Sequence, residues 1–141
     1  MITLELITLN GVKFSDDVYE VILPTPDGQI AVFPNHMPLV SLATPGVIAI
    51  RHREADADDK MDFFATNGGV IEINDRRVRV LVDEADDSAE VVEKEIEQAL
   101  ELAHQEAQNA KDQISLDKAN QLVATHQARL KVAGLRRHKR R

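Results

Sequence analysis

Histidines and carboxylates are the side chains of this chain that could do acid–base or metal chemistry. The sequence has no phosphate-binding glycine motif, no G-x-S-x-G turn and no H-E-x-x-H motif. It has no cysteine, which excludes disulfides and thiolate metal ligands. The carboxylates of residues 83–106 lack the glycine-containing spacing of a calcium loop and are typical of a solvated helix face. The sequence therefore predicts no catalytic residue, no metal site and no cofactor. The five histidines have no metal-like spacing: His36, His52, His104, His126 and His138.

Two of the histidines have other interpretations. His36 lies between prolines, where its imidazole either bonds the neighbouring backbone or contacts a partner, and the pattern favours neither. His126 falls on the apolar side of a helical repeat and is interpreted as a half-buried residue of a helix face.

The composition is typical of a folded globular protein. Of the 141 residues 43% are hydrophobic, but no run approaches the roughly 18 to 20 apolar residues that a membrane span requires. Residues 1–9 carry no charged flank or cleavage site, so no targeting segment is expected. Residues 129–141 hold seven of the 17 Lys and Arg and none of the 24 Asp and Glu. Such a basic end is either a solvated terminus or a contact to an acidic protein, a nucleic acid or an anionic lipid.

Residues 1–84 have the pattern of an antiparallel β domain. Short runs rich in β-branched residues recur at near-regular spacing with no helix between them, which is typical of a sandwich or barrel. Gly, Pro, Asn and Asp separate the runs. The expected strands are 2–8, 18–23, 30–33, 39–42, 47–53, 61–66, 70–73 and 78–82.

Residues 85–141 have the period of helices. Asp87 and Glu90 are the expected capping box of a first helix. Ser115 is the expected cap of a second helix, and Gly134 is its expected end. Two helices with a short link predict an antiparallel hairpin. Because most apolar residues of the first helix are alanines, we expect a hairpin that is marginal alone and stable when docked on the sandwich or on another protein.

Residues 27–46, D-G-Q-I-A-V-F-P-N-H-M-P-L-V-S-L-A-T-P-G, specify an unusual backbone. Pro34, Pro38 and Pro45 fix φ and remove amide donors, so residues 35–37 are expected to form a rigid, exposed corner. The string closely resembles the G-x-x-G-x-x-P-x-H-x-P-L motif of the epsilon subunit of F-type ATP synthases. A second element of that family, G-G-x-x-E-[IV], is present at residues 68–73. The resemblance covers effectively the whole chain.

The resemblance implies a fold and a function. The fold is an N-terminal sandwich of about ten antiparallel strands, residues 1–84, followed by a two-helix domain, residues 85–141. The function is that of a non-catalytic rotor subunit, one copy per complex, that links the gamma subunit to the membrane c-ring and couples proton flow to ATP synthesis. Its helices would restrain ATP hydrolysis through a transient contact with the alpha/beta head. The expected location is peripheral, on the cytoplasmic face of a bacterial plasma membrane.

The resemblance also assigns residues. The expected contacts with the c-ring and gamma are Gln29, Ile30, Phe33, His36, Met37 and Pro38. The structural turns are Gly28, Pro34, Pro45, Gly46, Gly68 and Gly69. The expected inhibitory contacts are the basic residues Arg129, Lys131, Arg136 and Arg137.

Two departures from the family pattern limit what the resemblance implies. Ala31 stands where the family commonly has a second glycine, so the backbone there must avoid positive φ or be strained. Family members that bind ATP carry I-D-x-x-R-A in the first helix. Here Val92 replaces the acid and Glu95 replaces the arginine. A glutamate would repel a triphosphate, so no strong ATP site is expected.

The alternative function is a generic β-sandwich binding module with a basic tail for nucleic acid or anionic surfaces. It leaves the corner and the Gly-Gly turn unexplained. Bases usually stack on exposed aromatic side chains, and this chain has only four Phe and one Tyr. No nucleic-acid partner is therefore predicted.

Overall fold

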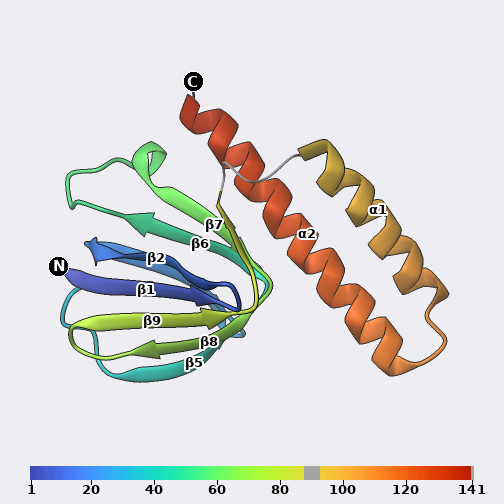
Figure 1. Ribbon diagram of the computed structural model, residues 1–141, viewed down its shortest axis with the longest axis horizontal. Helices are drawn as coiled ribbons and strands as arrows, with labels where there is room; N and C mark the ends of the chain where they lie inside the picture. The colour runs from blue at the N-terminus through green and yellow to red at the C-terminus, as the bar shows by residue number, and fades with distance from the viewer. Residues whose placement is uncertain (88–92, 141) are drawn as a thin grey trace.

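A computed structural model describes residues 1–87 and 93–140, with the side chains of 93, 94 and 136–140 left out of the description. Ten strands are followed by two helices (Figure 1). This confirms the predicted fold class, a sandwich of about ten strands and then a helical hairpin. The elements are β1 Ile2–Thr8, β2 Gly11–Val18, β3 Glu20–Thr25, β4 Gly28–Val32, β5 Leu39–Ala43, β6 Gly46–Arg51, a 3-10 helix η1 Asp58–Lys60, β7 Asp62–Thr66, β8 Gly69–Ile73, β9 Arg77–Val82, β10 Ala85–Asp87, α1 Glu93–Asn109 and α2 Gln113–Arg140.

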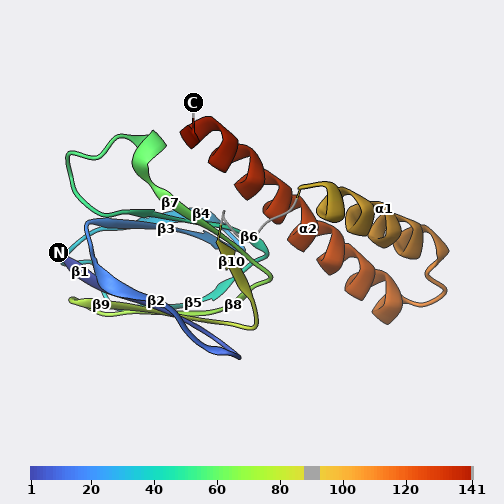
Figure 2. The ribbon, with the colours of Figure 1, turned by 45° about the horizontal axis from the view of Figure 1, so that its top comes forward.

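The strands form two five-stranded sheets that lie face to face (Figure 2). Sheet I has the order β2-β1-β9-β8-β5, and sheet II has the order β10-β7-β6-β3-β4. One ladder departs from the antiparallel expectation. β1 pairs with β9 in parallel, with Leu4 opposite Val78 and Leu6 opposite Val80. The N-terminal strand therefore lies inside sheet I rather than at its edge.

The core lies between the sheets because alternate residues of each strand point inward. In β1 the inward residues Ile2, Leu4 and Leu6 are fully buried, while Thr3 and Glu5 face outward. Each aliphatic side chain fully buried in this way contributes roughly 1.5 to 3 kcal/mol. The other fully buried residues of this core are Val18, Val21, Leu23, Val32, Ile48, Ile50, Ile71, Val78 and Val80.

The predicted strand pattern missed β2 and β10. β2 is a polar edge strand, and residues 15–17 are exposed. Asp17 accepts a hydrogen bond of 2.7 Å from the Thr3 hydroxyl. Charged side chains on an edge strand hinder pairing with other chains, but they also remove the hydrophobic signal that marks a strand. β10 has only three residues, two of them Asp, and is held by pairing with β7.

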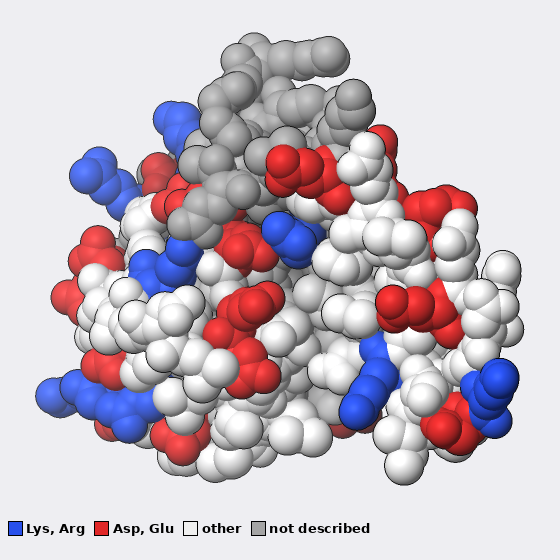
Figure 3. Space-filling model, turned by 45° about the vertical axis from the view of Figure 1, so that its right-hand side comes forward, with Lys and Arg blue, Asp and Glu red and all other residues white. Residues whose placement is uncertain are grey.

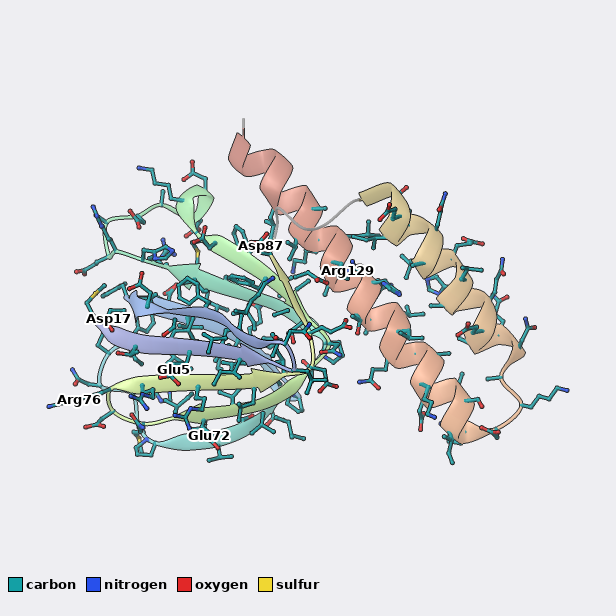
Figure 4. All side chains as sticks on the ribbon, in the orientation of Figure 1. Glu5, Asp17, Glu72, Arg76, Asp87 and Arg129 are labelled. Carbon is teal, nitrogen blue, oxygen red and sulfur yellow. The ribbon has the colours of Figure 1, made fainter. Side chains whose placement is uncertain are left out.

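The outer face of sheet I carries two rows of side chains in register, one charged and one apolar. Glu5 lies 3.6 Å from Arg77 and 3.3 Å from Arg79, measured from carboxylate oxygen to guanidinium Nε (Figure 4). The neighbouring row is apolar and crosses all five strands. Cross-strand partners on one face are in contact distance, so the members form a continuous strip. This apolar row is Val12, Ile7, Leu81, Val70 and Leu42.

The helical hairpin differs from expectation at its ends. α2 begins at Gln113, and Asp112 is its cap, accepting a hydrogen bond of 2.7 Å from the Ser115 amide. The expected cap at Ser115 is therefore wrong. Gly134 does not end the helix, which continues to Arg140. Asp87 lies in β10 rather than in a helix cap, and Glu90 is outside the described residues.

α2 packs on the outer face of sheet II. Because buried residues directly before Gly134 take part in this packing, the helix continues through the glycine. Val132 is fully buried, and Ala128 and Ala133 are nearly so. They meet Val47 of β6 and Ala65 of β7, with Ile96 of α1 completing the cluster. This small second core is separate from the core between the sheets. The described structure is therefore the docked state of the hairpin.

Candidate partner-contact sites

Residues 33–38 form the proline-locked corner. β4 is the edge strand of sheet II and β5 the edge strand of sheet I, so the corner carries the chain from one sheet to the other. Asn35, between Pro34 and His36, has φ of +66°. It is the only non-glycine residue with positive φ in the part of the chain that the structure describes. Asparagine tolerates this left-handed conformation better than most residues. The corner is therefore a fixed turn.

The corner presents both apolar and polar groups. Met37 is 79% exposed and Phe33 is 40% exposed. The Phe33 ring packs edge-on against Tyr19, with ring centroids 5.6 Å apart. His36 Nδ1 lies 2.6 Å from the Met37 carbonyl oxygen, a hydrogen bond that requires the proton on Nδ1. The backbone bond considered for His36 is thus present, and it fixes the ring beside Met37.

The six predicted contact residues are not one patch. Gln29 and Ile30 lie at the start of β4, and Gln29 is about 13 Å along the strand from Phe33. Ile30 packs against the core between the sheets. Gln29 lines a cleft of about 260 Å³ with Ala128 and Lys131 of α2. Phe33, His36, Met37 and the exposed Pro38 remain together at the corner.

The predicted turn residues serve different purposes. Gly28 and Gly68 adopt φ of +112° and +102°, which favours glycine. Gly46 and Gly69 are instead sites of close approach. A Cβ on Gly46 would lie 2.9 Å from the Pro24 Cβ, and a Cβ on Gly69 would lie 2.0 Å from the Leu81 carbonyl oxygen.

The other predicted turn positions also have identifiable places. Pro34 stands at the start of the corner turn, and Pro45 precedes β6 beside Gly68. Ala31 lies within β4, opposite Ile22, and avoids positive φ. The alanine therefore replaces the family glycine without backbone strain.

Two of the four predicted inhibitory residues have described side chains. Arg129 Nε lies 2.9 Å from Asp86 Oδ2 of β10, and both side chains are 28% exposed (Figure 4). The Nε–H does not point at the carboxylate, so the contact is an ion pair without that hydrogen bond. Lys131 is exposed beside Gln29, and the side chains of Arg136 and Arg137 are outside the described residues. In the docked state, Arg129 is thus engaged with the sandwich.

His126 lies half-buried on α2, as expected, close to the β9–β10 connection. Burial of the ring lowers the pKa of His126, the nearby Arg129 cation lowers it further, and Glu84 opposes both effects. The docked structure therefore favours the neutral imidazole.

The remaining predictions concern ATP binding, metal binding and membrane-spanning segments. Glu95 is an exposed residue of α1, and Val92 lies outside the described residues. Among the side chains that the structure describes, no three His, Asp or Glu gather as metal ligands would. Of the described helices, neither is long and apolar enough to cross a membrane.

Sequence reasoning missed the apolar row of sheet I and the Arg129–Asp86 ion pair. Val12 and Leu42 of the row are 65% and 62% exposed. Val12 lies in β2, whose polar residues hide the strand in the sequence, and the sequence does not show which strands are neighbours. A known strand order would have revealed the row.

The ten-strand sandwich with a docked two-helix hairpin defines a protein of the β-then-α class. Residues 1–88 match the family described as ATP synthase, Delta/Epsilon chain, beta-sandwich domain. The chain belongs to this family.

Relatives of similar length are named ATP synthase epsilon chain. The ATP synthase epsilon chain of Neisseria meningitidis serogroup B is 31% identical over 137 residues, 96% of this chain and 96% of that one. The ATP synthase epsilon chain of a Sulfurihydrogenibium species is 36% identical over 109 residues, 77% of this chain and 78% of that one.

Two solved structures share the fold. A chain of the Euglena gracilis mitochondrial ATP synthase, in an OSCP/F1/c-ring structure, has a TM-score of 0.78 and 21% identity, covering 95% of this chain and 81% of its own length. A chain of the Tetrahymena thermophila mitochondrial ATP synthase central stalk/c-ring has a TM-score of 0.67 and 15% identity, covering 92% of this chain and 94% of its own length.

Proposed function

We propose that this chain is the epsilon-type rotor subunit of an F-type ATP synthase. It is not catalytic itself and acts as a structural and regulatory part of a membrane-associated complex. It links gamma to the c-ring, one copy per complex, on the cytoplasmic face of a bacterial plasma membrane. The observation that carries this proposal is the proline-locked corner, a rigid group of exposed side chains that can bind a partner without an ordering cost.

The position of the corner supports this assignment. The corner lies where β4 ends and β5 begins, near Ile73 of the paired strand β8. The cleft between the sandwich and α2 lies at the other end of these strands, beside Gln29 and Gly46. A partner bound at the corner would therefore not prevent the hairpin from docking on the sandwich or from separating from it. This separation suits a subunit that is anchored at one end and regulates at the other.

The apolar row of sheet I supports contact with a second partner subunit. A contiguous exposed apolar strip on a folded domain is typical of a protein–protein interface. α2 covers the outer face of sheet II and leaves Val12, Leu42 and Leu81 of this row exposed. We infer that the row adds to the contact with gamma, while the corner faces the c-ring.

On the face that Figure 3 draws, the described side chains do not form the basic surface that the alternative nucleic-acid module would need. Figure 3 shows Asp and Glu side chains over both the sandwich and the hairpin, with separated Lys and Arg side chains between them. Nucleic-acid binding instead requires a continuous basic surface.

Affinity purification of the tagged full-length chain from its native membranes tests the function. We expect gamma and c subunits to copurify in stoichiometric amounts. Recovery of nucleic acid, or of the chain without rotor subunits, would contradict the proposal.

The proposed restraint of ATP hydrolysis resides in the basic end of α2. Exposed charge pairs contribute about 0.2 to 1 kcal/mol each, so several together can shift a two-state hairpin. We expect the triple substitution Lys131→Gln, Arg136→Gln and Arg137→Gln to raise ATP hydrolysis by the assembled enzyme at low salt. Because salt screens exposed charges, added salt should reproduce the rise in the unmodified enzyme.

The triple substitution leaves the Arg129–Asp86 ion pair intact, so the docked state keeps this contact. Lys111→Gln, an exposed substitution in the link between α1 and α2, is the matched control and should leave hydrolysis unchanged. Equal hydrolysis by the triple variant and the unmodified enzyme at low salt would refute the basic contact.

We infer that the chain has no strong ATP site because Val92 and Glu95 replace the acid and arginine of ATP-binding relatives. Millimolar ATP should therefore leave the melting temperature of the isolated chain unchanged. A micromolar site would stabilise it by about 4 kcal/mol at that concentration. The variant Val92→Asp with Glu95→Arg is the control that should gain a shift. A saturable shift in the unmodified chain would show that ATP binds through other residues.

A further inference from the structure

α2 meets the sandwich at a cleft of about 390 Å³ that contains the His126 ring. The sandwich contributes Asn67 from the β7–β8 turn and Asp83 and Glu84 from the β9–β10 connection. α2 contributes Lys118 and Arg129 beside His126, and no described residue of α1 lines the cleft. The ring is therefore at the boundary between the two parts that separate when the hairpin leaves.

His126 has an unmet hydrogen-bonding capacity in the docked state. Its Nδ1 atom is buried and has no hydrogen-bond partner. A neutral imidazole can leave a nitrogen lone pair unpaired at modest cost, whereas an imidazolium must find partners for two N–H donors. The docked geometry thus suits a neutral ring.

The charges around the ring have opposing effects. Arg129 lies close to the ring in α2 and is held there by Asp86 of β10. Glu84 faces the ring from the sandwich and partly offsets this cation, while Asp83 and Lys118 also line the cleft. Burial of the ring and the Arg129 cation together outweigh Glu84, so the pKa of His126 lies below its ordinary value. A proton on the ring would place a second cation beside Arg129 in a half-buried site.

We propose that His126 is a pH-sensitive latch whose protonation releases the helical hairpin from the sandwich. The undocked ring is solvated and has an ordinary pKa near 6.5. At pH 7.5 and above the ring is largely neutral in both states, so docking varies little with pH. As pH falls below that value the undocked state binds the proton more tightly, so the undocking constant rises by at most tenfold per pH unit. The rise stops once the docked ring is also protonated.

The regulatory meaning of the latch rests on the proposed rotor function, but the docking equilibrium does not. The latch is therefore tested on the isolated full-length chain. The natural sequence has no cysteine, so Asn10→Cys and Asn120→Cys place two unique spin labels, on an exposed sandwich turn and on α2. Pulsed electron–electron double resonance then measures the distance between the two labels, and the distance distribution gives the ratio of docked to undocked chains.

We expect a mainly docked, shorter-distance population with a minor longer-distance one at pH 7.5, and a longer-distance population up to about tenfold larger at pH 5.5. His126→Gln and His126→Leu should both remove this pH response, and two neutral variants guard against a folding defect in either. His126→Arg should favour the longer distance at both pH values. His104→Gln, an exposed substitution on α1, should respond as the unmodified chain does.

Two results would overturn the latch. One is an unchanged distance distribution between pH 7.5 and 5.5 in the unmodified chain. The other is a pH response that persists in both neutral His126 variants. Either result would leave the purification of rotor partners unaffected, and a failure of that purification would leave the pH response standing.

Discussion

Replacing Gly69 with alanine is expected to destabilise the sandwich by about 3 kcal/mol or more. The added Cβ would lie 2.0 Å from the Leu81 carbonyl oxygen and 2.9 Å from the Val82 Cα. Both atoms belong to the backbone of β9, so no side-chain rotation can relieve the overlap. The β8–β9 ladder, in which Gly69 pairs with Val82, must then open. Urea denaturation followed by circular dichroism measures the loss.

Gly134→Ala is the matched control for that substitution. A Cβ at Gly134 meets nothing within 4 Å, and the residue lies inside α2. Alanine is favoured over glycine in a helix interior by about 1 kcal/mol, so this variant should be as stable as the natural chain or more so. A Gly69→Ala variant with an unchanged urea midpoint would show that β8 and β9 can separate without cost.

Charge introduced at the corner is expected to abolish rotor assembly and coupled ATP synthesis while leaving the fold intact. In the variant His36→Glu with Met37→Glu, two carboxylates would replace a fixed imidazole and a largely exposed apolar side chain. Burying unpaired carboxylates in an apolar contact is strongly unfavourable, so we expect at least a tenfold loss of synthesis. The readouts are subunit recovery and proton-driven ATP synthesis in membranes.

Two controls separate assembly from general effects of charge. Gln29→Glu adds charge at the other end of β4 and tests whether that residue belongs to the contact. Leu102→Glu adds charge at an exposed apolar residue of α1 and should be tolerated in assembly. Normal ATP synthesis by the variant His36→Glu with Met37→Glu would show that the corner has only a structural role.

Much of the fold could be predicted from hydrophobic periodicity. β1 was predicted with the bounds that the structure has, because its buried residues Ile2, Leu4 and Leu6 alternate with outward-facing residues. β2 was missed because an edge strand needs only a weak apolar face. The end of α2 was misplaced at Gly134 because a local glycine signal was outweighed by the docking of Val132 and Ala133 on sheet II. Glycine in a helix interior costs only about 1 kcal/mol relative to alanine, and tertiary contacts override a local preference of that size.

The candidate sites could be predicted only where a short segment forms them. The corner is built from consecutive residues, so its prolines and Asn35 specify it locally. The pairing of Arg129 with Asp86 joins two distant segments of the chain, and neither segment identifies the other. The same is true of Gln29, whose proximity to Lys131 depends on how α2 lies across the sandwich.

The parallel ladder between β1 and β9 has a consequence for the order in which the chain folds during synthesis. Of the ten strands β1 is made first and has β2 available at once, but its other neighbour is not made until residues 77–82. Pairings between such distant segments are slow because they close a long loop. Both sheets have all their strands once Asp87 is made, before α1 begins at Glu93. The nascent sandwich can therefore close first, and the hairpin then folds onto a surface that is already complete.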